Sequence, residues 1–246
     1  MLSNVNAVLR GGKSRLRAPY DYIQDIVELH LDTYLARSSE DIKQIVIVGG
    51  CDACEVSRMQ RNYPSAQFIV FEPSRRYYPP LQRRFKDCSK VVCIERAVAD
   101  NPGRATFYET SLRGSGSLLK PAAAANRDYG LVLAETFEVE VVTLDGFFSQ
   151  QSPPLSTIDL LWCDVQGAEL KVLRGGIETL RRCRAIFLEV TCWEQTYSGA
   201  PLLKEICDWL SPMGFCPCGL GIDPLNGTGN AFFINPAQRG AFRKKL

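Results

Sequence analysis

The chain of 246 residues has a single histidine, little net charge and no long apolar segment. Its 29 Lys and Arg residues nearly balance 27 Asp and Glu residues, and the resulting charge of +2 gives no overall attraction to nucleic acid. No apolar run approaches the roughly 18 residues that a membrane span needs, and the N-terminal segment lacks the apolar stretch of a signal peptide. We therefore expect a cytoplasmic protein that binds neither a membrane nor nucleic acid.

A disulfide framework is also not expected, although the chain contains ten cysteines. Most of them lie inside apolar segments, and a chain of this length can bury a core without cross-links. We therefore interpret the cysteines as reduced thiols, most of them in the core.

Apolar residues recur at helical spacing between Tyr20 and Arg37, which predicts an amphipathic helix. The only histidine, His30, falls on the apolar stripe, and this position favours a packed core side chain over a catalytic one. Basic residues precede this helix at Arg10–Arg17. We therefore divide the chain into residues 1–44, a basic segment and a helix packed on the core, and residues 45–246, a single domain.

Short apolar runs rich in β-branched residues alternate with helix-length segments along most of the chain. This alternation favours an α/β fold with a parallel sheet covered on both faces. The expected strands of that sheet are Ile45–Val48, Phe68–Phe71, Val91–Ile94, Ile158–Trp162 and Ala185–Val190. The expected helices are Cys54–Tyr63, Arg75–Phe85, Glu169–Arg182 and Leu202–Leu210.

Four further strands do not follow the alternation. Arg104–Glu109 and Thr136–Val142 flank a segment rich in Gly, Ser and Ala. Near the end of the chain, Cys216–Ile222 and Ala231–Ile234 flank Asn226-Gly227, a dipeptide that favours tight turns between strands. The last two strands are therefore predicted to form a C-terminal hairpin.

Candidate binding residues follow the first two strands, where a doubly wound sheet holds its ligand. Gly49 and Gly50 end the first strand, and their missing side chains would let a ligand approach the backbone. Glu72 ends the second strand, near the roughly 20-residue offset at which an acidic side chain accepts hydrogen bonds from a ribose. The pattern predicts a nucleoside site, with an ordinary turn and a surface carboxylate as the alternative.

The turn after the first strand lacks the G-x-G-x-x-G pattern that places a pyrophosphate on a helix N-terminus. Asp52 in this turn would also repel a phosphate group. A cofactor with a ribose and an adenine but no phosphate fits better, and S-adenosylmethionine meets this description.

Two further acids follow neighbouring strands of the predicted sheet. Asp164 comes after Ile158–Trp162, and Glu189 lies near the end of the next strand. Such acids could take a proton from a substrate hydroxyl, orient that hydroxyl or hold a cation. Asp164 could instead cap the helix that follows it.

The stretch Ile158–Gly176 reads IDLLWCDVQGAELKVLRGG and closely resembles the I-D-L-L-K-I-D-V-E-G-A-E motif of FkbM-type S-adenosylmethionine-dependent methyltransferases. Further landmarks of that family have counterparts in the same order: Phe71-Glu72-Pro73, Ala97–Asp100, Gly114–Leu119 and Thr143–Asp145. The resemblance extends from Ile45 to about Pro236.

The resemblance implies a class I methyltransferase fold, a Rossmann-like, mostly parallel sheet of seven strands with helices on both faces. The implied reaction is methylation of a hydroxyl group on a small metabolite, a sugar or a polyketide-type acceptor. Asp164 and Glu189 would be the catalytic residues, and no metal ion is expected. The implied cofactor-binding residues are Gly49, Gly50 and Asp52 at the methionine half, Glu72 and Pro73 at the ribose, Ala97 and Val98 at the adenine, and Asp164 beside the sulfonium.

The sequence departs from the family pattern at four positions. Ile47, Ala53, Gln166 and Thr191 stand where members often have an acid, a glycine, Glu and His. These departures leave open a non-catalytic member of the same fold that binds a nucleoside or a partner protein.

Two hypotheses of a different kind rest on cysteine spacing. Cys51 and Cys54 form a C-x-x-C pattern at the start of a helix, as in thiol redox proteins. Together with Cys216 and Cys218 they could be assembled into a zinc site, although C-x-C is poor zinc spacing. The charge of the acceptor is also open, because Arg113, Lys120 and Arg127 fit either an anionic acceptor or a solvated loop.

Overall fold

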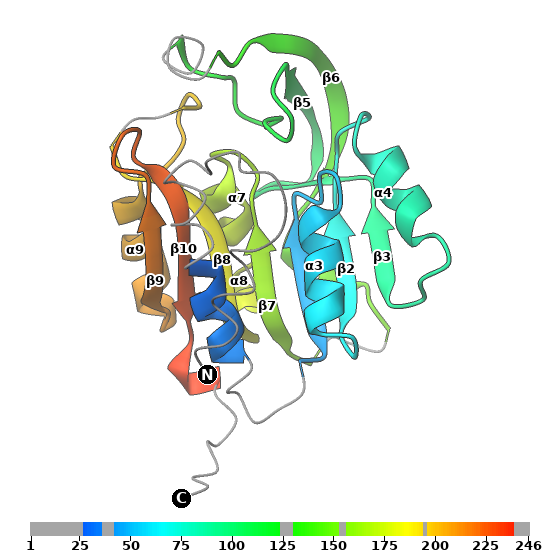
Figure 1. Cartoon of the computed structure of the whole chain (residues 1–246), viewed down its shortest axis with the longest axis vertical. Helices are drawn as coiled ribbons and strands as arrows, with labels where there is room; N and C mark the ends of the chain where they lie inside the picture. Colours follow the sequence, from blue (N-terminus) through cyan, green and yellow to red (C-terminus); the bar gives the residue numbers. More distant parts are fainter. Residues whose placement is uncertain (1–26, 36–41, 124–129, 153–155, 194–195, 239–246) are drawn as a thin grey trace, which may run out of the picture.

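The computed structural model describes residues 27–35, 42–123, 130–152, 156–193 and 196–238, and its main element is a seven-stranded sheet (Figure 1). In spatial order its strands are β3 (Val91–Ile94), β2 (Gln67–Phe71), β1 (Gln44–Val48), β7 (Ile158–Cys163), β8 (Cys183–Thr191), β10 (Thr228–Ile234) and β9 (Cys216–Ile222). The strands from β3 to β8 pair in parallel, whereas β10 is antiparallel to both β8 and β9. The expected mostly parallel sheet and its C-terminal hairpin are confirmed.

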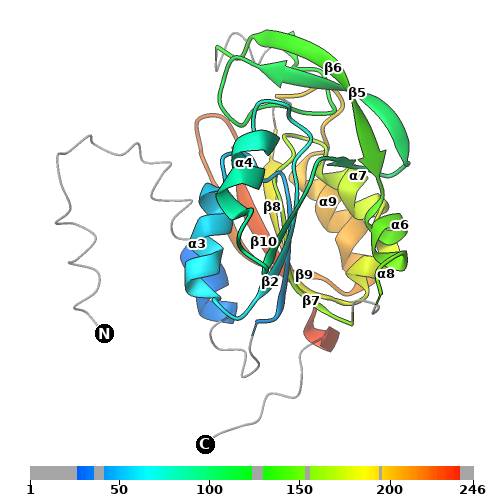
Figure 2. The same ribbon diagram turned by 90° about the vertical axis from the view of Figure 1, so that its right-hand side faces the viewer.

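Helices cover both faces of this sheet because alternate strand residues point to opposite faces. In β1, Val46 and Val48 pack into one hydrophobic cluster, whereas Ile45 and Ile47 pack into the other. Figure 2 shows α3 and α4 on one face and α6 to α9 on the other. The bounds of these helices are α3 (Cys54–Asn62), α4 (Tyr78–Phe85), α6 (Leu144–Ser149), α7 (Glu169–Arg174), α8 (Ile177–Leu180) and α9 (Leu203–Leu210).

The N-terminal helix is described over residues 27–35. Its Val27, Leu31 and Leu35 pack into the same cluster as α3 and α4. His30 is exposed, so the expectation that it packs in the core is wrong. Spacing of four residues defines the buried stripe, and His30 is rotated about 100° away from Leu31. Arg10–Arg17 lies outside the described residues, and the division of the chain at residue 44 stays a prediction.

A second, smaller sheet contains β4 (Ala97–Val98), β6 (Leu133–Val142) and β5 (Gly103–Thr110), in that spatial order. Figure 1 shows β5 and β6 above the carboxyl ends of the large sheet. This sheet has a small apolar cluster of its own, which includes Phe107 and Phe137. Two of the four strands that do not follow the sequence alternation, β5 and β6, therefore lie over the carboxyl ends of the large sheet.

The segment Glu169–Arg182, expected as one helix, is divided into α7 and α8. A Cβ atom at Gly175 would collide with the carbonyl oxygen of Ala99. The second helix has its own cap, because the carboxylate of Asp145 accepts a hydrogen bond from the backbone N–H of Thr179 at 2.8 Å. The close approach to the chain at Ala99 thus interrupts a segment whose apolar pattern continues. The other predicted elements whose expected bounds lie within the described residues begin and end within three residues of those bounds.

All ten cysteines lie within the described residues, and all are free thiols. The reduced state stays a prediction, but the expectation that most are core residues is wrong, because only Cys163 and Cys183 are buried. Within the same described residues, no helix combines the length and the apolar character that crossing a bilayer requires.

The crevice for a ligand is set by the direction in which the chain leaves two adjacent strands. From β1 it continues to β2 and β3 on one side, and from β7 it continues to β8 on the other. The strand order therefore reverses between β1 and β7, and open α/β sheets bind ligands at the carboxyl ends of the strands at such a point.

At the opposite, amino end of the sheet, a buried ion pair joins three strands. The guanidinium of Arg184 in β8 donates to Asp159 in β7 at 2.8 Å. The other carboxylate oxygen of Asp159 accepts from the backbone N–H groups of Lys43 and Gln44 at 2.7 and 2.9 Å. Asp159 therefore connects the starts of β1, β7 and β8.

We expect Asp159→Asn to lower the free energy of unfolding by about 3–5 kcal/mol, because the substitution leaves the Arg184 charge buried without its counter-ion. Asp87→Asn, at a largely exposed carboxylate, serves as the control and should change stability by less than about 0.5 kcal/mol. Urea unfolding of the two variants measures both values. Equal midpoints for the two variants would contradict this role of the buried pair.

Candidate active site

A cleft of about 800 Å³ opens at the carboxyl ends of β1, β2 and β7. Its lining comes from the turns after these strands and from the small sheet above them. Of the residues predicted from sequence, the cleft brings together Gly49, Asp52, Glu72, Pro73, Ala97, Val98, Asp164 and Glu189. Gly50 is not among the lining residues.

The two glycines after β1 are required by chain packing. Gly49 has φ +94°, and a Cβ atom there would collide with the carbonyl oxygen of Asp164. A Cβ atom at Gly50 would lie 2.6 Å from the side chain of Val70 and 3.0 Å from that of Leu81. The first glycine therefore lets the chain after β7 approach β1, and the second lets α4 pack on β2.

Glu72 is buried at the end of β2, and its carboxylate holds the turns on either side of the cleft. It accepts hydrogen bonds from the backbone N–H groups of Cys51 at 2.6 Å and Ser74 at 2.7 Å. Burial raises the pKa of Glu72 to about 7, although these two hydrogen bonds act in the opposite direction. A carboxylate offers about four acceptor positions, so it retains capacity for a ligand.

A second buried acid, Glu109 of β5, lines the same part of the cleft and was missed in the sequence. One of its carboxylate oxygens accepts a hydrogen bond from the Ser74 hydroxyl at 2.5 Å. The only sequence signal is its spacing of two from Phe107, which places both side chains on one face of β5.

An ion pair lies at the rim of the cleft. The guanidinium of Arg113, in the Gly/Ser-rich segment, pairs with the carboxylate of Asp52. Both residues therefore have a structural partner. The hypothesis that Arg113 contributes to an anionic acceptor site loses its support, and Arg127 lies outside the described residues.

Three carboxyl groups converge beyond β7 and β8. One carboxylate oxygen from each of Asp164, Glu169 and Glu189 lies within 4.8 Å of the other two. Burial raises the pKa of all three groups. The pKa of Glu189 is raised well above its ordinary value, because the charges of Asp164 and Glu169 act in the same direction as burial. The contact between Asp164 and Glu189 acts in opposite directions on the two groups: it lowers the pKa of Asp164 and raises that of Glu189.

Gln166 is placed between the two members of this pair. Its side-chain amide donates to Asp164 at 2.8 Å and to Glu189 at 2.6 Å. Its amide oxygen lies 3.0 Å from the Tyr197 hydroxyl, which also lies 2.7 Å from the carbonyl oxygen of Ser115. A glutamate at this position would place another acid here, so the amide suits the cluster better.

Backbone geometry fixes Gln166 in this place. Its φ of +58° is unusual for a residue with a side chain, and Gly167 follows with φ +91°. Glu169 stabilises this turn by accepting from the N–H groups of Val165 at 3.0 Å and Gly167 at 3.2 Å. Asp164 does not cap the next helix, because α7 begins at Glu169. Glu169 is therefore a structural residue, whereas Asp164 is available to the cleft.

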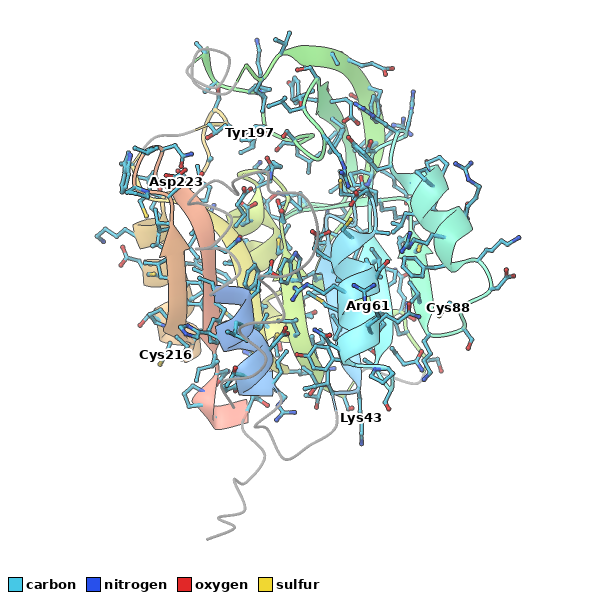
Figure 3. All side chains as sticks on the ribbon, viewed as in Figure 1. Lys43, Arg61, Cys88, Tyr197, Cys216 and Asp223 are labelled. Carbon is cyan, nitrogen blue, oxygen red and sulfur yellow. The ribbon has the colours of Figure 1, made fainter. Side chains whose placement is uncertain are left out.

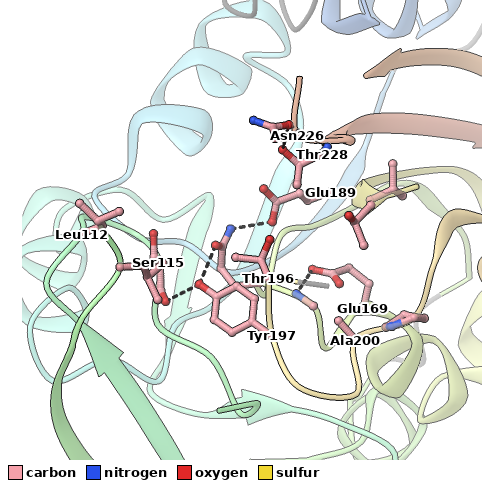
Figure 4. Close-up of a pocket in the computed structure, with 15 residues that line it drawn as sticks. Leu112, Ser115, Glu169, Glu189, Thr196, Tyr197, Ala200, Asn226 and Thr228 are labelled. Atoms are coloured by element: carbon pink, nitrogen blue, oxygen red, sulfur yellow. Dashed lines mark hydrogen bonds between the residues drawn. The ribbon is translucent and has the colours of Figure 1, made fainter. Parts of the chain in front are cut away.

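A smaller cavity of about 340 Å³ adjoins the cleft (Figure 4). The two share Ser115, Gln166 and Glu189 as lining residues. In Figure 3 Tyr197 lies at the carboxyl end of the large sheet, whereas Lys43 lies at the other end. The remaining lining residues of the smaller cavity are Leu112, Leu131, Gly167, Glu169, Val190, Thr191, Thr196, Tyr197, Ala200, Pro201, Asn226 and Thr228.

The departures from the family pattern have different positions. Ile47 is buried in the apolar cluster beneath α3, and the members of that cluster would offer an acid no polar partner. Ala53 has φ +70°, which explains why glycine suits this position. Thr191 lines the smaller cavity, where a histidine would project from the end of β8.

The redox and zinc hypotheses do not agree with the structure. Burial raises the pKa of Cys51 to about 12, and the Glu72 charge acts in the same direction, so the reactive thiolate is disfavoured. Cys216 lies on the edge strand β9, whereas Cys54 begins α3 on β1 and β2 (Figures 1 and 3). The structure therefore does not bring together the four cysteines of the zinc hypothesis.

Comparison with known proteins identifies the fold and the family. The METTL16 MTase domain superposes with a TM-score of 0.50 at 9% identity, over 86% of this chain and 67% of that one, and supports the fold alone. 2-O-methyltransferase NoeI of Sinorhizobium fredii (strain NBRC 101917 / NGR234) is 31% identical over 173 residues, which are 68% of this chain and 70% of that protein. Methyltransferase 1 of Beauveria bassiana (strain ARSEF 2860) is 29% identical over 143 residues, 53% of this chain and 57% of that protein.

The sequence model described as the Methyltransferase FkbM domain matches residues 48–217. This range includes all residues that line the cleft and the three acids Asp164, Glu169 and Glu189. With its seven-stranded class I methyltransferase sheet, the chain belongs to the FkbM methyltransferase family.

Proposed function

We propose that this methyltransferase transfers a methyl group from its cofactor, S-adenosylmethionine, to a hydroxyl group of a small acceptor such as a metabolite, a sugar or a polyketide-type molecule. The observation that carries the proposal is the hydrogen-bonded group of Asp164, Gln166 and Glu189 at the junction of two cavities. The name of the relative NoeI, a 2-O-methyltransferase, supports oxygen as the methylated atom.

The chemistry of the cleft fits this cofactor. Its acidic lining suits a molecule with a positive sulfur and an ammonium group, and it would repel a pyrophosphate. Glu72 retains acceptor capacity for ribose hydroxyls, and Ala97 and Val98 offer an apolar surface for a base. The acidic residues that line the cleft are Asp52, Glu55, Glu72, Glu109, Asp164 and Glu189.

The smaller cavity is suited to hold the acceptor. Leu131, Val190 and Pro201 give it apolar walls, and its only charged lining residues within the described chain are Glu169 and Glu189. Because no described Lys or Arg lines it, an acceptor with a phosphate or carboxylate would find no counter-ion there. The cavity therefore favours an acceptor without negative charge.

The bound cofactor supplies an electrophilic methyl group, and the chain supplies alignment and a proton acceptor. Asp164 is the proposed base, because it lines the cleft and accepts a hydrogen bond from the Gln166 amide, which favours its ionised form. Gln166 keeps the Asp164 carboxylate in place, and Tyr197 orients the Gln166 amide. Proton transfer from the acceptor hydroxyl to Asp164 raises the nucleophilicity of the oxygen that receives the methyl group.

Ligand-dependent thermal unfolding tests the cofactor. A ligand at about 100 times its Kd stabilises a protein by about 2.7 kcal/mol, which is several degrees for a chain of this length. We expect S-adenosylmethionine and S-adenosylhomocysteine to raise the Tm by this amount and NAD to leave it unchanged. An unchanged Tm with all three at millimolar concentration would contradict the proposed function and favour the non-catalytic alternative.

Glu72→Gln should raise the Kd of S-adenosylhomocysteine about tenfold or more at pH 8, because a charged acceptor is lost. Since the pKa of Glu72 is about 7, protonation removes the same charge from the wild type at lower pH. The difference between the two proteins should therefore shrink as the pH falls through about 7. Calorimetric titration between pH 6 and 8 measures it, with Glu178→Gln, at an exposed residue of α8, as the control. A difference that does not change with pH would remove the assigned role of the Glu72 charge.

The two members of the acid pair should respond differently to neutral substitution. Asp164→Asn removes the base and should lower the rate of methyl transfer by about 10²–10⁴-fold. Glu189→Gln leaves Asp164 and its hydrogen bond from Gln166 in place, so the loss should stay within about tenfold. Rates are measured with a neutral hydroxylated acceptor found by screening, and S-adenosylhomocysteine binding controls for cleft integrity. Full activity of Asp164→Asn would exclude it as the base.

A further inference from the structure

The carboxyl group of Glu109 has one oxygen without a hydrogen-bond partner among the described residues. The residue is 5% exposed, and its side chain lines the cleft. Its other oxygen is occupied by the Ser74 hydroxyl, which fixes the orientation of the whole group. A buried acceptor without a donor is costly, so such groups in folded proteins usually have a partner that completes them. The free oxygen therefore marks a position at which a ligand would supply a donor.

The surroundings of Glu109 indicate which part of a ligand reaches it. Its neighbour on the same face of β5, Phe107, lines the cleft, as do Ala97 and Val98 from β4 and Leu118 from the Gly/Ser-rich segment. Ala97, Phe107 and Leu118 pack in one apolar cluster, so this part of the cleft offers an apolar surface to a ring. Ser74 connects Glu109 to Glu72, because its hydroxyl donates to the first and its backbone N–H to the second. Since Glu72 is the candidate for the ribose hydroxyls, Glu109 is left for another part of the nucleoside. A carboxylate beside such a surface accepts from a ring substituent that carries N–H.

We propose that Glu109 recognises the exocyclic amino group of the adenine and thereby selects an aminopurine cofactor. This inference rests on the proposed function, because it assumes that the cleft holds S-adenosylmethionine. The selecting residue comes from β5, a strand that none of the sequence motifs for the nucleoside site includes. Glu72 then holds the ribose and Glu109 reads the base, with Ser74 connecting the two carboxylates through its backbone N–H and its hydroxyl.

The proposal predicts a reversal of base preference. S-inosylhomocysteine differs from S-adenosylhomocysteine by a carbonyl oxygen in place of the amino group and by a proton on the adjacent ring nitrogen. We expect the wild type to bind the adenosine compound at least about tenfold more tightly, because the carbonyl oxygen would face an acceptor. In Glu109→Gln the side-chain amide can donate to that carbonyl oxygen. The ratio of the two Kd values should therefore fall to about one or reverse.

Calorimetric titration of the full chain with both compounds measures this ratio without any methyl transfer. Glu135→Gln, at the exposed residue opposite Glu109 on β6, is the matched control and should keep the wild-type ratio. Equal affinity of the wild type for the two compounds would overturn the proposal. An equal loss of affinity for both in Glu109→Gln would also overturn it, because the carboxylate would then contact a part that the two compounds share. If neither compound binds the wild type, the proposed function itself fails, which is a different result.

Discussion

The site depends on the close approach of two chain segments at the ends of β1 and β7. Gly49 has no side chain, and the carbonyl oxygen of Asp164 occupies the space where one would be. The backbone N–H of Asp164 donates to the carbonyl of Val48 at 3.0 Å, so the two strands stay paired up to the point where the chain diverges. From there one segment turns toward Glu72 and the other toward Gln166. Both cavities therefore originate from one contact at the reversal of strand order.

The carboxyl groups at this edge of the sheet repel one another when they are ionised, and their burial destabilises the fold. Hydrogen-bond donors of the chain offset part of this cost. Burial raises the pKa of Glu72 and of Glu169 to about 7, far above the 4.5 of a free glutamate. An acid whose pKa is higher in the folded state weakens the fold as the pH rises from its unfolded pKa to its folded one, because ionisation then costs more in the folded protein. Backbone N–H groups at Glu72 and Glu169 and the Gln166 amide at Asp164 lower this cost without removing it. Such a concentration of perturbed carboxyl groups is typical of a functional site.

The sequence predicts those parts of the protein that depend on local pattern. The alternation of β-branched runs and helices is enough for the parallel sheet, and Asn226-Gly227 is enough for the hairpin. It fails where a distant segment decides the outcome. Gly175 ends α7 because Ala99, far away in the chain, lies against it.

The candidate site shows the same limit. The sequence indicates Asp164 and Glu72 because they follow strands, and it shows that Gln166 replaces a common glutamate. It does not show that a left-handed backbone and Tyr197 aim the Gln166 amide at both acids. The sequence does not indicate Glu109 as a site residue for a similar reason, because its hydrogen-bond partner Ser74 lies 35 residues earlier in the chain.

The two cavities share Ser115, Gln166 and Glu189 as lining residues, and this constrains how the protein can diverge over evolution. A substitution at Gln166 changes the lining of both cavities and the contacts of Asp164 and Glu189 at once. Asn226 and Thr228, on the C-terminal hairpin, line the smaller cavity alone. Mutations at these two hairpin positions can therefore change the smaller cavity while the lining of the cleft stays unchanged.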